Sequence, residues 1–130
     1  MSYTPQPAQP MSAREERNWS VLTHVIAGGV HVVTADWAGF VAALVLYFVF
    51  KDRGPFIRAH TVSALNFQLT MLIAVIIGWI LSATVILAII GVPLLIAVAV
   101  VNIIFSILAA LAASRGEYYR YPMSIEFVKA

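Results

Sequence analysis

The chain has 130 residues, of which 62% are hydrophobic and only 11% are charged, and its net charge is +2 at neutral pH. This composition excludes an ordinary soluble domain, and without a broad basic face it argues against nucleic-acid binding. The chain has no cysteine, which excludes disulfides and zinc–thiolate sites. We therefore expect one all-α integral membrane domain over residues 12–130.

Residues 1–11 are rich in proline and glutamine and are predicted to form a disordered tail. Order is expected from Ser12, because Ser12 and Glu15 have the spacing of a capping box, which satisfies free amides at a helix start. The first helix is predicted over 13–33. A cleaved signal peptide is the alternative, but the charged run 14–17 lacks the net positive charge of such a segment.

The second helix is predicted over 36–50 and is short for a membrane span. Its apolar part reaches only about 21 Å, against a hydrocarbon core of about 30 Å. We therefore expect local thinning of the bilayer or incomplete penetration. A charged loop over 51–58, which contains Gly54 and Pro55, follows this helix and forms the main cytoplasmic connection.

The last two helices are predicted within 61–114, which holds no charged residue and is too long for one crossing. The chain must fold back, and Gly91 and Pro93 favour a turn between helices over 61–90 and 93–114. A turn near 82–84 is the alternative.

A tyrosine-rich segment follows the last predicted helix and is typical of an aromatic belt at a membrane interface. Beyond it, apolar and polar residues alternate over 123–128, which favours an extended conformation. We expect residues 117–128 to form an interfacial strip on the bundle.

Every basic residue falls in a terminal region or in the connection after the second predicted helix. These residues are Arg14, Arg17, Lys51, Arg53, Arg58, Arg115, Arg120 and Lys129. Four crossings place all of them in the cytoplasm, whereas three crossings, with 19–50 as one helix, place Arg14 and Arg17 opposite the other six. We expect a four-helix bundle in the cell membrane (the bacterial inner membrane), with four transmembrane helices and both termini cytoplasmic.

Polar side chains in or near the helices form the candidate site, because an unpaired polar group is costly in lipid. The candidate cluster is Arg17, His24, Arg58, His60, Asn66, Gln68, Asn102, Glu117 and Arg120. We expect Arg58 and His60 to meet Glu117 or Glu16, and Asn66 to bond backbone groups freed at a helix end.

Chemical roles for the histidines are limited by their spacing. His24 and His31 are seven residues apart, about 10.5 Å along a helix, which is too far to hold one metal ion together. We expect no metal, no cofactor and no catalytic residue. A proton relay is the alternative role, because imidazole titrates near neutral pH.

Small residues recur at four-residue spacing in both late helices, at Ala74, Gly78 and Ser82 and at Ser106 and Ala110. Such ladders predict close helix packing. The spacing alone does not decide between packing inside one chain and packing between two copies.

Four blocks of the sequence resemble small bacterial membrane proteins known as domain of unknown function forty-eight-seventy. The blocks are residues 16–19 leading to His24, residues 51–60, residues 64–68 and residues 116–122. These proteins are related to the Tic-twenty subunit of the chloroplast inner-envelope translocon. The resemblance implies four helices with cytoplasmic ends, which agrees with the charge distribution.

The same resemblance implies a non-enzymatic interaction or assembly protein, a translocon-like component, rather than an enzyme. A small transporter or channel is the alternative, with a pathway lined by polar side chains at His24, Asn66 and Asn102. The expected partners are membrane lipid and either other membrane proteins or further copies of the chain, and not nucleic acid.

Overall fold

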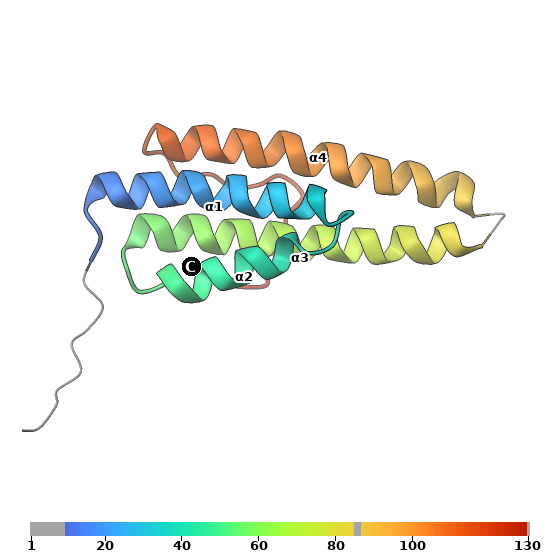
Figure 1. The fold of residues 1–130 in the computed structure, drawn as a ribbon, viewed down its shortest axis with the longest axis horizontal. Coiled ribbons are helices and arrows are strands. Elements are labelled where there is room, and N and C mark those ends of the chain that lie inside the picture. The colour runs from blue at the N-terminus through green and yellow to red at the C-terminus, as the bar shows by residue number, and fades with distance from the viewer. Residues whose placement is uncertain (1–9, 85–86, 130) are drawn as a thin grey trace, which may run out of the picture.

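The computed structural model describes residues 10–84 and 87–129, which fold into four α-helices (Figure 1). They are α1 (Ala13–Val33), α2 (Gly39–Phe50), α3 (Pro55–Ala83) and α4 (Ala88–Ser114). The expected all-α class and the expected four helices are therefore confirmed. The bounds of the last three helices differ from those predicted.

The prediction of a disordered tail is wrong for Met11. Residues 1–9 lie outside the described part of the chain, but Met11 belongs to the fold. Its amide donates to the Arg53 carbonyl (2.9 Å), and its side chain packs with Phe50 and Ile57. α1 then begins after Ser12, whose hydroxyl accepts a hydrogen bond from the Glu15 amide (3.1 Å).

α3 begins six residues before the predicted start at residue 61, because α1 supplies its cap. The buried carboxylate of Glu16 accepts a hydrogen bond from the Ile57 amide (2.8 Å), one of the free donors of the first turn. Pro55 occupies the first turn, where a missing N–H costs nothing. Gly54 leaves room for the Glu16 carboxylate, since a Cβ there would collide with it.

The turn between α3 and α4 also lies elsewhere than predicted, because α3 ends at Ala83 and not near Gly91. Gly91 lies inside α4, where a Cβ would be 2.8 Å from the Gly78 carbonyl and closer still to Ser82. The glycine thus permits close helix packing instead of ending a helix. Pro93 lies inside α4 as well. The alternative turn near 82–84 is the one that matches the end of α3.

The four helices are not equally long, and this divides the molecule into two regions. α1 and α2 lie beside one end of the α3–α4 hairpin, which continues well beyond them (Figure 1). The α1–α2 turn, residues 34–38, lies near Gln68, because Gly39 packs directly on the Gln68 side chain. We call residues 69–83 and 88–101 the distal hairpin, and the remainder the four-helix region.

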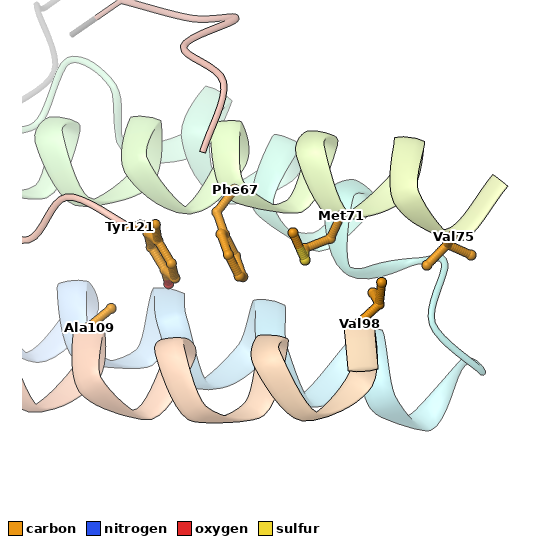
Figure 2. Close-up of a cluster of buried hydrophobic side chains, with 6 residues drawn as sticks. All are labelled: Phe67, Met71, Val75, Val98, Ala109 and Tyr121. Atoms are coloured by element: carbon orange, nitrogen blue, oxygen red, sulfur yellow. The ribbon is translucent and has the colours of Figure 1, made fainter. Parts of the chain in front are cut away.

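The C-terminal residues 117–128, here called the C-terminal strip, turn back onto the bundle. α4 ends with Gly116 in the left-handed conformation (φ 75°), and the Glu117 amide donates to the Ala112 carbonyl (2.9 Å). Figure 2 shows Tyr121 of the strip beside Phe67 between α3 and α4, and the two rings stack with centroids 4.1 Å apart. The strip therefore contributes a core side chain.

The outer surface of the helices is largely apolar away from the charged end, as a lipid environment requires. Large hydrophobic side chains are exposed along all four helices, among them Leu22, Phe48, Ile80 and Ile89. α3 and α4 are each long and apolar enough to cross a membrane, whereas α2 is apolar but has only 12 residues.

Candidate functional site: a polar core in the four-helix region

The buried polar side chains gather in the four-helix region. They are Glu16, Ser20, Thr23, His24, His31, His60, Thr61, Asn66, Gln68, Asn102 and Ser106. Ser20, Thr23 and Thr61 donate to carbonyl groups of their own helices and need no further partner. The others bond between helices or across to the C-terminal strip, or lie between them.

A chain of hydrogen bonds joins three segments through two histidines. His24 of α1 is fully buried, and its Nδ1 lies 2.6 Å from the Tyr121 hydroxyl of the strip. Its Nε2 lies 2.8 Å from Nδ1 of His60 in α3, and Nε2 of His60 lies 2.9 Å from the backbone carbonyl of Glu117. We call this set the histidine chain.

The backbone carbonyl of Glu117, at the end of the histidine chain, determines which nitrogen of each histidine carries the proton. A backbone carbonyl only accepts, so neutral His60 must carry its proton on Nε2 and accept on Nδ1. His24 must then donate from Nε2 and accept on Nδ1 from Tyr121. Burial raises the pKa of the Tyr121 hydroxyl, so this group keeps its proton and remains a donor. Each of the four groups therefore has a hydrogen-bond partner, and each bond runs from donor to acceptor in the direction from Tyr121 to Glu117.

An amide pair joins α3 to α4 next to this chain. The Gln68 side chain donates to Asn102 Oδ1 (3.2 Å), and the Asn102 side chain donates back to Gln68 Oε1 (3.0 Å). The Ser106 hydroxyl also donates to Asn102 Oδ1 (3.1 Å). Gly28 of α1 packs so closely on Ser106 that a Cβ there would be only 2.8 Å away. The amide pair therefore lies where three helices meet.

His31 and Asp36 lie beside each other at the α1–α2 turn. His31 Nε2 lies 3.3 Å from Asp36 Oδ1, and the two side chains are 2% and 18% exposed. The two atoms are close enough for electrostatic attraction, but their alignment does not meet hydrogen-bond geometry. This pair does not touch the histidine chain, in which His24 bonds to Tyr121 and His60.

Polar side chains on one face of α3 hold the C-terminal strip. Asn66 donates to the Val128 carbonyl (2.7 Å) and accepts from the Val128 amide (2.6 Å), so it pairs with the strip as a neighbouring strand would. Thr70 accepts from the Ile125 amide (2.9 Å), and Ser63 donates to a carbonyl of the strip. Asn66 therefore bonds backbone of the strip, and not the backbone at a helix end that the sequence suggested.

The structure does not bring the expected charged groups together. The Glu117 carboxylate pairs with Arg115 (3.0 Å), and only the Glu117 backbone meets His60. Arg58 donates to the Lys51 carbonyl (3.3 Å) in the α2–α3 loop and does not meet Glu117. The expected pairing of Arg58 with Glu117 or Glu16 is therefore wrong, because each carboxylate has a nearer donor.

Two further arginines of the candidate cluster also lie apart from the histidine chain. The Arg17 guanidinium lies against Gly116, at the end of α4. Arg120 is exposed and lines a polar pocket of about 140 Å³ between α3 and the strip. Neither arginine contributes a group to the histidine chain or to the amide pair.

Sequence reasoning did not identify Tyr121, which is the donor of the histidine chain. It lies among three closely spaced tyrosines, two of which are not buried, and the sequence does not tell which ring turns inward. The sequence does not indicate the partner of Ser63 either, because this partner is a backbone carbonyl that any residue could supply. Within residues 10–84 and 87–129, no three His, Asp or Glu side chains are grouped to hold a metal ion.

An apolar outer surface around a hydrogen-bonded polar core defines a small α-helical membrane protein. The model of the magnetosome magnetite crystal formation protein family, MamF/MmsF, matches residues 15–128, and the chain belongs to this family. No curated protein and no solved structure matches the chain.

The family match corrects the resemblance drawn from sequence blocks. The chain belongs to the MamF/MmsF family, so its assignment to the Tic-twenty-like proteins, and the translocon-like role it implied, are wrong. The structure gives a physical reason for the error. The quoted blocks contain Asn66, which holds the strip, and Gly116, which ends α4. Such residues serve the packing of a bundle, and packing alone does not define a function.

Proposed function

We propose that this chain is a multi-pass protein of the magnetosome membrane that acts in magnetite crystal formation, with both termini in the cytoplasm. The observation that carries the proposal is the family match, which extends from the first turn of α1 to residue 128 of the strip. The expected partners are membrane lipid and other proteins of the same membrane.

The proposed orientation follows from the charged end of the bundle. All the basic residues lie at the start of α1, in the α2–α3 loop and the first turn of α3, or between the end of α4 and residue 129, and the positive-inside rule places such segments in the cytoplasm. From Thr61 to Ala83, α3 holds no charged residue and is about 34 Å long, enough to cross a hydrocarbon core of about 30 Å. α4 returns over a similar length.

The α1–α2 hairpin is proposed to enter from the cytoplasm and to turn inside the membrane. Its turn lies near Gln68, and α3 continues for about 22 Å beyond that level. This proposal replaces four full crossings by two full crossings and one re-entrant hairpin. Both versions keep the termini on the same side.

The hydrogen bonds of the turn support this placement, because exposed backbone in lipid must find partners within the protein. The Asp36 amide donates to the His31 carbonyl (2.8 Å), and the Ala35 amide donates to Val32. The Ala38 amide donates to the Thr34 hydroxyl (3.0 Å). The Asp36 carboxylate has His31 beside it, which reduces the cost of holding a carboxylate at this depth.

We further propose that the protein does not act as an enzyme. The polar core uses its hydrogen-bonding groups on one another, which fixes three helices and the strip in one arrangement. Its contribution to crystal formation would then depend on the surfaces that this arrangement holds in place.

Deletion and complementation in a magnetite-forming bacterium test the proposal, with crystal size and number measured by electron microscopy. Deletion should reduce the crystal size, the crystal number or both, and the parent gene should restore the normal values. Tyr121→Phe removes the donor of the histidine chain and should restore them incompletely. Tyr118→Phe is the matched control, since Tyr118 is 64% exposed. Immunoblots of membranes verify equal abundance, and normal crystals in the deletion strain would refute the role.

A further inference from the structure

The width of the molecule changes along the membrane normal. Four helices and the C-terminal strip lie side by side at the charged end, whereas only the distal hairpin continues beyond the α1–α2 turn (Figure 1). A helix with its side chains is about 10 Å across, so the cross-section falls roughly by half between these two levels. The protein is therefore wedge-shaped.

Both levels of this wedge expose apolar side chains. In the distal hairpin, Ile80 is 64% exposed and Ile89 is 80% exposed, and both are strongly apolar. At the wide level, α2 exposes Val45 and Phe48 on its outer face.

The strip adds to the wide level, and its pattern is opposite to that of a strand on a soluble protein. Met123, Ile125 and Phe127 are exposed, while Ser124 and Glu126 line the pocket against α3, with Glu126 itself also exposed. Apolar side chains that point away from the protein are stable only where lipid covers them. The strip thus occupies area in the same leaflet as α1 and α2.

We infer that this protein favours bilayers that are strongly curved with the cytoplasmic leaflet on the convex side. The inference rests on the orientation given under the proposed function. In a curved bilayer the convex leaflet has a larger area than the concave leaflet. A protein that is wider in the convex leaflet therefore fills space that lipid tails would otherwise have to fill. A cylindrical protein has no such preference.

The wedge acts on the bilayer only if it is stiff, and the structure supplies that stiffness. The amide pair and the histidine chain hold the wide level together. The narrow level is held by Gly78, which packs on Leu95, and by Gly91, which packs on Ser82. Lipid therefore adapts to the protein, at a cost of the kind known for hydrophobic mismatch.

A compartment that encloses a crystal inside the cell has its cytoplasmic leaflet on the convex side. The wide end of the protein therefore lies in the leaflet that must expand as such a compartment forms. The fold then recognises membrane curvature through lipid packing, and this recognition requires no particular lipid headgroup.

Membrane tubes pulled from giant vesicles test the inference with the intact protein. The N-terminus carries a fluorophore, and an impermeant quencher added outside identifies vesicles in which the charged end faces out. The protein is kept dilute so that crowding does not contribute. In these vesicles the ratio of protein density in the tube to that in the vesicle, normalised to a lipid dye, should exceed one and rise as the tube narrows.

Vesicles with the opposite orientation are the matched control, because the same protein then has its wide end on the concave leaflet. Their density ratio should fall below one. A ratio of one in both orientations, or the same deviation in both, would overturn the inference. Neither outcome depends on magnetite, so complementation of crystal formation can succeed or fail independently.

Discussion

The helices of the four-helix region and those of the distal hairpin are held together by different kinds of contact. In the four-helix region, partners are selected by hydrogen bonds, as in the pairing of Gln68 with Asn102. In the distal hairpin, the Ser82 hydroxyl is buried and has no hydrogen-bond partner among the described residues. The two helices are held together there by close approach at Gly78 and Gly91. In lipid, hydrophobicity does not distinguish one helix contact from another. Specific pairing therefore needs either polar groups or small residues.

The largest difference should appear at two adjacent glycines of α1. A Cβ at Gly28 would lie 2.8 Å from Ser106, whereas a Cβ at Gly29 would meet nothing within 4 Å. Gly28→Leu should therefore lower the free energy of unfolding by about 3 kcal/mol, the upper end of ordinary overpacking costs. Gly29→Leu should change it by less than about 1 kcal/mol, because Leu also favours a helix. Denaturation with dodecyl sulfate in micelles measures both, and equal effects would contradict the α1–α4 contact.

Breaking the amide pair should cost less, and the two changes should not add. Gln68→Leu or Asn102→Leu each leaves a buried amide without its partner, at about 1–2 kcal/mol. The double variant should cost clearly less than the sum, since neither amide then remains without the other. Ser82→Ala is the matched change in the distal hairpin, and it should lie within about 0.5 kcal/mol of the parent. Strict additivity at Gln68 and Asn102 would mean that the two amides do not interact.

The attachment of the strip should be weaker still and can be measured locally. Asn66→Leu removes two hydrogen bonds to Val128. Together these are worth about 1.4 kcal/mol, so trypsin cleavage after Arg120 should become about tenfold faster if it follows local opening. Ser114→Ala removes only a bond within α4 and should leave the rate unchanged. Unaltered cleavage in Asn66→Leu would show that the strip is held by other contacts.

The smallest effect concerns the ionisation of Tyr121. Burial raises the pKa of this hydroxyl, so it should not contribute to tyrosinate absorbance up to about pH 11. Because the pKa is higher in the folded state, the stability gained from this group is present below about pH 10 and is lost as the pH rises further. Tyr121→Phe should therefore keep the full absorbance change of the parent. A reduced change in Tyr121→Phe would show that the hydroxyl is accessible.

How far the sequence predicted each region depends on how local the determining contacts are. The start of α1 follows from Ser12 and Glu15, which are three residues apart, and it could be predicted. The sequence offered two turns between α3 and α4 and could not decide between them, because the role of Gly91 depends on Ser82 and Gly78 of the facing helix. A glycine that ends a helix and a glycine that permits close packing look the same in sequence.

The candidate site shows the same limit. The sequence indicated which polar residues lie inside the helices, because a charged or amide side chain in an apolar run is conspicuous. The actual partners could not be predicted, since His24 bonds to Tyr121, which is 97 positions away. The unequal length of the two hairpins also depends on how Gly39 packs on Gln68, and not on helix length alone.

The most direct test of the account is the depth of the α1–α2 turn, and three native tryptophans provide the probes. Trp19, Trp37 and Trp79 are 37%, 47% and 45% exposed, so lipid can reach each ring. Variants that keep one tryptophan and replace the others with phenylalanine are reconstituted in lipids brominated at different depths. Trp37 should be quenched most by bromine near the bilayer centre, and Trp19 by bromine near the headgroups. If Trp37 instead shows the shallow profile of Trp19, the turn reaches the far surface, and both the re-entrant hairpin and the wedge are wrong.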